Sequence, residues 1–189
     1  LQESNTTLIL KSVQFVNQST GWICGESRLI LKTMNGGTNW DSHISGTTDH
    51  LTDIHFSDLN TGYVVGFGGK ILKTTNGGSA WVSLPSGTSS NLYAVDFIDT
   101  NSGYVIGGEL GNWLILKTTD GGASWANKSS SFPYTYGFPI TVEFINSDLG
   151  FVGGGITPHS NYIYKTIDGG NTWIQSILSP NLKEKESSQ

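Results

Sequence analysis

A nine-residue motif that occurs four times constrains this chain more than any other feature. It has the form Lys-Thr-x-Asn/Asp-Gly-Gly-x-x-Trp, and its copies are KTMNGGTNW, KTTNGGSAW, KTTDGGASW and KTIDGGNTW, which end at Trp40, Trp81, Trp125 and Trp173. Successive Trp residues lie 41, 44 and 48 positions apart. A motif that returns at such a period is typical of an array built from one supersecondary unit.

The turn inside the motif is expected to be structural. Its Asn-Gly or Asp-Gly pair predicts a type I′ hairpin turn with positive φ at both residues and a bulge at the second glycine. The Thr hydroxyl and the Asn or Asp side chain would bond the backbone of the turn, and the Trp would pack inside. A sugar-stacking platform is the alternative role for the Trp. The positions expected to be structural are Thr33, Asn35, Gly37, Trp40, Thr74, Asn76, Gly78, Trp81, Thr118, Asp120, Gly122, Trp125, Thr166, Asp168, Gly170 and Trp173.

A second pattern lies upstream of each motif. A short alternating segment ends in Phe, a polar turn ends in Gly, a segment that opens on an aromatic residue follows, and an apolar segment leads into the motif. Together with a strand after the Trp, each unit has four short strands in about 40–45 residues, the size of a propeller blade. The sequence therefore predicts an all-β propeller or partial propeller domain over residues 11–180, with blades at about 11–46, 51–87, 92–128 and 139–180.

The two ends of the chain depart from this pattern. SNTT at Ser4–Thr7 aligns with SGTT at Ser45–Thr48, one repeat later. Residues 1–10 are therefore expected to be the end of a preceding fourth strand, and residues 181–189 a polar tail. We expect an open arc in which Leu1 to Leu10 does not return to the fourth blade, and association through the open blade faces.

Composition excludes several classes of function. The net charge is −5 and Arg28 is the only arginine, so no basic stripe is available to neutralise nucleic-acid phosphates. No apolar run is long enough for membrane insertion. Cys24 is the only cysteine, which excludes an internal disulfide. The four histidines, at 43, 50, 55 and 159, show no metal-ligand spacing, so neither a metal nor a cofactor is expected.

The repeated motif resembles the Asp-box, or BNR repeat, of sialidase-type β-propellers. With the GWICG, GYVVG, GYVIG and GFVGG segments, the fuller pattern is most similar to the photosystem II assembly and stability factor family and its bacterial relatives. The resemblance covers roughly residues 10–178. It implies that the Asp-box is a fold element in the turn between the third and fourth strands, away from the functional face. Four repeats are fewer than the seven blades usual in such propellers, and the arginine-rich patch of that family has no counterpart here.

The resemblance raises two enzymatic activities, a sialidase and a glycosidase. Sialidase activity needs several arginines to bind the sialic acid carboxylate, and one arginine excludes it. A glycosidase with two carboxylates is the alternative. Gln14, His55, Asp96 and Glu143 occupy one register of the four first strands, which would line a central channel. Asp53 shares the face of His55. Cross-blade hydrogen bonding or a solvated channel wall is the other interpretation of these polar positions.

The loops that differ between repeats are the best candidates for recognition. Length varies between the second and third strands and in the link between blades 3 and 4, and both kinds of loop emerge on one face. Aromatic residues on loops are enriched at recognition surfaces, although they would also serve as a lid over the blade edges. The candidate ligand-binding residues are Trp113, Phe132, Tyr134, Tyr136, Phe138, His159 and Tyr162.

These observations predict a non-catalytic binding or assembly scaffold outside the cytoplasm. Its partner would be a protein or a glycan. The alternative is a fragment of a glycan-active, glycoside hydrolase-like propeller that uses the channel carboxylates.

Overall fold

Four antiparallel sheets of four strands each make up the structure, a computed structural model that describes residues 6–132, 137–156 and 160–176. In every sheet the strands lie side by side in chain order, as in a propeller blade. The first two blades comprise β1 (Leu10–Phe15), β2 (Gly21–Gly25), β3 (Leu29–Thr33), β4 (Asp41–Ile44), β5 (Leu51–Phe56), β6 (Gly62–Gly66), β7 (Lys70–Thr74) and β8 (Val82–Leu84), with the 3-10 turn η1 (Phe67–Gly69) between β6 and β7. The last two comprise β9 (Leu92–Phe97), β10 (Gly103–Glu109), β11 (Asn112–Thr118), β12 (Ala126–Asn127), β13 (Phe138–Phe144), β14 (Gly150–Ile156), β15 (Ser160–Thr166) and β16 (Ile174–Gln175), with η2 (Ser129–Ser131) after β12.

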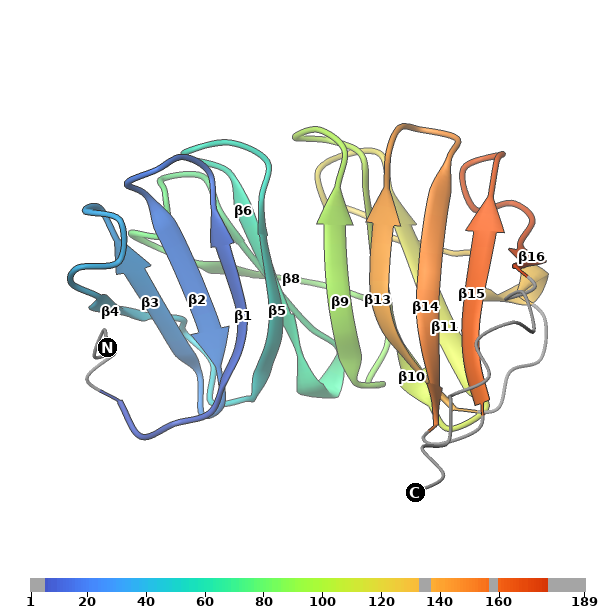
Figure 1. The fold of residues 1–189 in the computed structure, drawn as a ribbon, viewed down its shortest axis with the longest axis horizontal. Coiled ribbons are helices and arrows are strands. Elements are labelled where there is room, and N and C mark those ends of the chain that lie inside the picture. The colour runs from blue at the N-terminus through green and yellow to red at the C-terminus, as the bar shows by residue number, and fades with distance from the viewer. Residues whose placement is uncertain (1–5, 133–136, 157–159, 177–189) are drawn as a thin grey trace, which may run out of the picture.

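The sheets stand side by side in an open arc (Figure 1), with blade 1 and blade 4 at its two ends. The described part of the N-terminal segment stays with its own blade: the Ile9 carbonyl accepts a bond from Glu26 N–H at 3.0 Å. Leu10, the first residue of β1, pairs with Gly25. The described residues before β1 therefore lie beside blade 1.

The turn between the first two strands has the same design in all four blades. An Asn or Asp carboxamide or carboxylate oxygen accepts two backbone N–H groups, as Asp58 does from Asn60 and Thr61 at 2.6 and 2.7 Å. The turn ends in a glycine on which the Phe of the first strand lies. A Cβ on Gly62 would be 2.6 Å from the Phe56 ring, so only glycine fits at this position.

The Asp-box also repeats one hydrogen-bond pattern. In the second box the Thr74 hydroxyl donates to Asn76 Oδ1 at 2.9 Å and accepts Gly78 N–H at 2.9 Å, and Asn76 Oδ1 accepts Ala80 N–H at 2.9 Å. The type I′ prediction is wrong in its register. Positive φ falls on the two glycines, 66° at Gly77 and 84° at Gly78, and not on Asn76.

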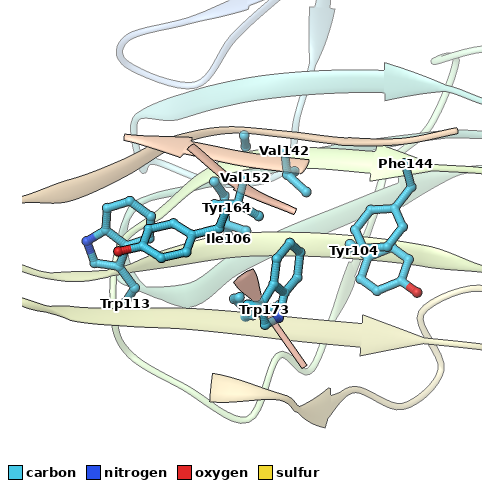
Figure 2. Close-up of a cluster of buried hydrophobic side chains, with 10 residues drawn as sticks. Tyr104, Ile106, Trp113, Val142, Phe144, Val152, Tyr164 and Trp173 are labelled. Atoms are coloured by element: carbon cyan, nitrogen blue, oxygen red, sulfur yellow. The ribbon is translucent and has the colours of Figure 1, made fainter. Parts of the chain in front are cut away.

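The cores lie between blades, where aromatic rings of neighbouring blades stack. Trp22 stacks on Phe56 with centroids 3.6 Å apart, Tyr63 on Phe97 at 3.6 Å, and Tyr104 on Phe144 at 3.4 Å. Figure 2 shows the third of these cores, in which Trp173 also meets Phe144 edge-on. The box Trp residues thus pack at the interfaces: Trp173 is buried, and Trp40, Trp81 and Trp125 are half-buried.

In blades 1, 2 and 3, a lysine and an aromatic residue hold the Asp-box of the next blade. Lys73 Nζ and Tyr63 OH both donate to the Gly121 carbonyl, at 2.8 and 3.1 Å. Lys32 and Trp22 do the same at Gly77, and Lys117 and Tyr104 at Gly169. We call this arrangement the box clamp. It explains why the lysine that opens the motif recurs: it is a donor across the blade interface.

Candidate functional site

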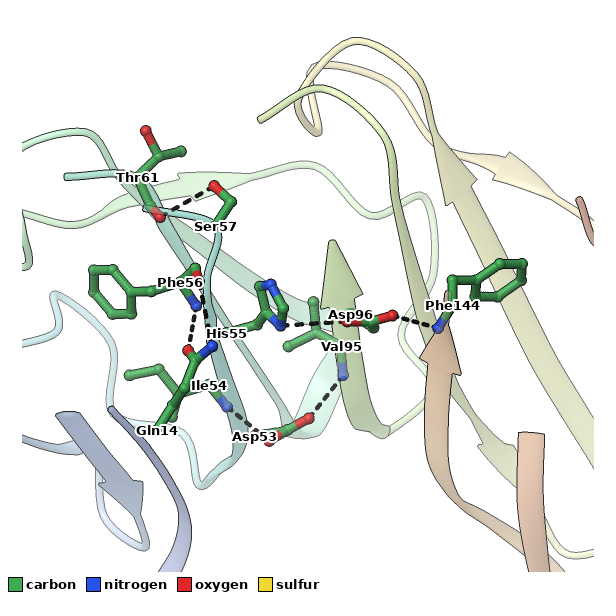
Figure 3. Close-up of polar contacts among 10 residues, drawn as sticks. All are labelled: Gln14, Asp53, Ile54, His55, Phe56, Ser57, Thr61, Val95, Asp96 and Phe144. Atoms are coloured by element: carbon green, nitrogen blue, oxygen red, sulfur yellow. Dashed lines mark hydrogen bonds and ion pairs between the residues drawn. The ribbon is translucent and has the colours of Figure 1, made fainter. Parts of the chain in front are cut away.

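The first candidate is the row of polar side chains on the innermost strands, defined as Gln14, His55, Asp96 and Glu143 and called the polar row below. Figure 3 shows that Gln14 and Asp96 bond the backbone of the following blade and that His55 faces the Asp96 carboxylate. Gln14 Oε1 accepts Phe56 N–H, and Gln14 Nε2 donates to the Phe56 carbonyl at 3.2 Å. Asp96 accepts Phe144 N–H at 2.6 Å, and His55 Nδ1 lies 3.4 Å from the other oxygen of Asp96.

Asp53, two residues before His55 in β5, also bonds the backbone of the next blade. One carboxylate oxygen accepts Ile54 N–H and the other accepts Val95 N–H of the next blade, both at 2.9 Å. Burial raises the pKa of Asp53 and of Asp96, and burial lowers the pKa of His55. The two carboxylates and the imidazole therefore lie in partly desolvated positions, and both carboxylates already accept backbone N–H groups. Glu143, the last member of the row, is exposed.

The second candidate is the end of the blades that lies at the bottom in Figure 1 and is called the lower rim. It carries the hairpins between second and third strands and the links into the next blade. These segments are bonded to one another. Arg28 N–H donates to the Asp49 carbonyl at 3.0 Å, Gly68 N–H to Asn91 Oδ1 at 3.1 Å, and Gly111 N–H to the Gly137 carbonyl at 3.1 Å.

The predicted aromatic residues divide into two groups at the lower rim. Trp113 is only 4 % exposed, its Nε1 donates to the Gly137 carbonyl at 2.8 Å, and the half-buried Phe132 packs against it and against Tyr164. These two rings therefore pack in the core beneath the rim. Phe138, at 36 % exposure, and the half-buried Tyr162 reach the surface. Tyr134, Tyr136 and His159 lie outside the described residues.

Sequence reasoning missed Tyr93, which meets Phe138 edge-on with ring centroids 6.1 Å apart. Tyr93 occupies a β-bulge, because β9 and β10 change register between Ala94 and Leu92. A bulge redirects one side chain away from the regular alternation. The equivalent bulge in β13 falls at Ile140, which is 64 % exposed. A bulge occurs at the same place in all four first strands. The sequence does not reveal it, because a change of strand register leaves no pattern in the residues.

A groove of about 1040 Å³ lies at the edge of blade 1 and is lined by Arg28, Lys70 and Asp49 among others. Lys70 pairs with Asp49 at 3.4 Å, and Thr47 Oγ1 donates to Asp49 at 2.6 Å. The hydrogen bond from Thr47 lowers the pKa of Asp49. Arg28 has a left-handed backbone, with φ 65°, so the hairpin is bent where the only arginine of the chain stands. In the described ranges no group of three or more His, Cys, Asp and Glu residues could hold a metal ion.

Comparison with known proteins assigns the family. Residues 80–187, more than half of the chain, match the profile of the family described as photosynthesis system II assembly factor YCF48. The chain belongs to the YCF48 family. The resemblance inferred from the Asp-boxes is thus confirmed. A search of curated proteins found no match.

Solved structures confirm the propeller fold of this YCF48-family chain. YCF48 from Cyanidioschyzon merolae superposes with a TM-score of 0.73 at 18 % identity, over 95 % of this chain and 60 % of that chain. A structure described as YCF48 bound to D1 peptide superposes with a TM-score of 0.59 at 15 % identity, over 92 % and 83 % of the two chains. A GH74 enzyme of Niastella koreensis gives 0.67 at 19 % identity, over 84 % and 28 %.

The YCF48-family chain thus spans only part of each of these three proteins. At such identities the superpositions establish the fold and leave the activity to the site itself. No helix in the part of the chain that the structure describes is long and apolar enough to cross a membrane.

Proposed function

We propose that the chain is a non-catalytic scaffold that binds a polypeptide segment at the lower rim, where blades 3 and 4 meet. The observation that carries this proposal is the edge-on pair of the half-buried Tyr93 and the exposed Phe138, which come from strands of two different blades. Exposed aromatic rings on a rigid frame are the usual anchors of protein interfaces, because they bury a large area at low entropic cost.

The surroundings of this pair suit an apolar polypeptide. Ile140 and Leu110 add exposed apolar surface, at 64 % and 47 % exposure. Tyr162, on β15, is half-buried. The D1 peptide in the described YCF48 complex is a polypeptide ligand of a relative with the same fold. With one arginine in the whole chain, recognition would depend on apolar contacts rather than on bidentate pairing with carboxylates.

The polar row argues for a scaffold instead of a glycosidase. A carboxylate that acts as acid, base or nucleophile must offer an oxygen to the substrate. Both oxygens of Asp53 accept backbone N–H groups, and Asp96 is divided between Phe144 N–H and His55. These side chains fasten neighbouring blades, which leaves Glu143 as the exposed acid of the set.

Fluorescence anisotropy with a labelled D1 peptide, and with peptides selected from a random display library, tests the proposal. Phe138→Ala and Tyr93→Ala should each weaken binding by roughly tenfold or more, as expected for anchor residues. Val82→Ala is the matched control, since Val82 is 64 % exposed on the outer strand β8, and it should leave binding unchanged.

Two results would contradict the scaffold. One is the absence of any peptide whose binding depends on Phe138 and Tyr93. The other is turnover of xyloglucan or a β-glucan that disappears in Glu143→Gln, which would favour the glycan-active alternative.

We further infer an extracytoplasmic setting, in line with the photosystem II assembly family. Fractionation of the source cells with an antibody against the chain tests this. Recovery together with a cytoplasmic marker would refute it.

A further inference from the structure

The hairpin between β10 and β11 is bonded to both segments that carry the ring pair of the peptide site. Gly108 N–H donates at 2.9 Å to the backbone carbonyl two residues before Tyr93. Gly111 N–H donates at 3.1 Å to the backbone carbonyl directly before Phe138. The two residues between these bonds are exposed, and the first of them is Glu109. An acidic side chain therefore stands at the surface next to the two rings.

Glu109 brings a negative charge close to the Tyr93 ring. Burial raises the pKa of the Tyr93 phenol, a hydrogen bond with the Asn91 side chain opposes this shift, and the Glu109 carboxylate adds to it. In the part of the chain that the structure describes, ion pairs join Lys11 to Glu26, Lys70 to Asp49 and His55 to Asp96. Glu109 belongs to none of these pairs, so its charge is available to a ligand.

Blade 1 shows how the chain pairs an acid at this level of the rim. Lys11 occupies the β-bulge of β1, the position that Tyr93 has in β9. Its Nζ lies 3.4 Å from Oε1 of Glu26, on the hairpin between β2 and β3. In blade 3 the hairpin again carries an acid, whereas the bulge carries Tyr in place of Lys. Blade 3 thus keeps the acid of this arrangement and lacks its cation.

We propose that the polypeptide bound at this site carries a lysine or arginine beside its apolar anchor and pairs it with Glu109, a proposal that rests on the peptide site of blades 3 and 4. The basic group of the ligand would take the part that Lys11 has in blade 1, and the Tyr93 ring would add a cation–π contact. The chain uses the same contact internally, where Lys73 Nζ lies 5.3 Å from the centroid of the Tyr63 ring. Glu109 would then select basic segments over acidic ones, because a like charge beside it is repelled.

Parallel selection from a random peptide display library tests this preference. The wild type and Glu109→Gln serve as targets, and peptides that also bind Phe138→Ala are discarded. The wild-type pool should be enriched in Lys and Arg over the input library, and the Glu109→Gln pool should lose this enrichment. Glu26→Gln is the matched control, because it makes the same change on the hairpin of blade 1, and its pool should stay enriched.

Fluorescence anisotropy with one wild-type-selected peptide, and with the same peptide carrying norleucine in place of its basic residue, completes a double-mutant cycle. Glu109→Gln should weaken binding of the basic peptide by roughly two- to fivefold at low salt, the range of an exposed ion pair. It should leave binding of the norleucine peptide unchanged. High salt should reduce the difference between the two peptides. Both amide variants should melt as the wild type does, so that lost binding reports on charge.

The two ways in which binding could fail are distinguishable. Peptides that depend on Phe138 but show no enrichment in basic residues would refute the role of Glu109 and leave the peptide site standing. So would a basic peptide that binds Glu109→Gln as tightly as it binds the wild type. The absence of any peptide that depends on Phe138 would refute both the peptide site and its charge preference.

Discussion

In the turns of this protein, side-chain oxygens repeatedly accept the N–H groups that a backbone carbonyl would otherwise accept. In every box a Thr hydroxyl, 1 % exposed, stands where a strand ends and bonds the turn glycine. The next side chain is Asn in boxes 1 and 2 and Asp in boxes 3 and 4. Boxes 3 and 4 also have a hydroxyl four residues after the Asp and gain one bond from it: Asp120 Oδ2 accepts Ser124 Oγ–H, and Asp168 Oδ2 accepts Thr172 Oγ–H, both at 2.6 Å.

This difference predicts an acid sensitivity in boxes 3 and 4 that boxes 1 and 2 lack. The hydroxyls of Ser124 and Thr172 lower the pKa of Asp120 and Asp168 from 3.8 to about 2. A lowered pKa in the folded state adds stability above the unfolded pKa, and this stability is lost as the pH falls from about 4 through about 2. In Asp120→Asn/Asp168→Asn, thermal melts should therefore change less over this range than in the wild type. Asp41→Asn, outside the boxes, should behave like the wild type, and equal acid sensitivity of the double variant would contradict the assignment.

At the scale of elements, the innermost strands are tied to one another by side chains instead of by a continuous backbone ladder. Gln14, Asp53 and Asp96 each reach the N–H group of a residue in the next first strand. Amide and carboxylate do the same task at equivalent positions, so the requirement is an acceptor oxygen and not a charge. The polar row was expected from its register, and the cross-blade partners came from the structure.

A pair of substitutions at Asp96 tests that requirement. Asp96→Ala leaves Phe144 N–H without its acceptor at an interface, and an unpaired buried donor costs about 1–3 kcal/mol. Asp96→Asn keeps an acceptor oxygen and removes a carboxylate whose pKa is raised by burial, so it should be close to neutral. Urea unfolding of both variants measures the difference. Equal destabilisation by Ala and Asn would show that the charge matters more than the bond.

At the scale of the whole molecule, stability depends on three interfaces in series, because each blade touches only its neighbours. Cys24 lies in the first of these interfaces, and its reactivity can be used to measure how often that interface opens. It is 0 % exposed and belongs to the cluster that joins blade 1 to blade 2. Burial raises the pKa of its thiol far above the ordinary value, so a thiol reagent can react only when the two blades separate.

Thiol labelling should therefore measure the opening of that interface. Native chain should react with a thiol reagent far more slowly than urea-unfolded chain. Gln14→Ala, which removes both bonds to Phe56, should accelerate labelling, whereas Asp96→Ala at the third interface should affect it much less. Equal acceleration by both variants would mean that the blades open together, as one cooperative unit.

The sequence by itself determined the parts of this protein that depend on neighbours in the chain. The Asp-box, the Asn or Asp turn before each second strand, and the division into four-stranded blades all follow from turn chemistry and from alternation within a few residues. The tertiary structure decided what depends on how blades pack. It buried Trp113, placed Tyr93 in a bulge and paired Asp96 with Phe144. These outcomes depend on contacts between residues that are far apart in the chain, and the propensities of neighbouring residues do not predict such contacts.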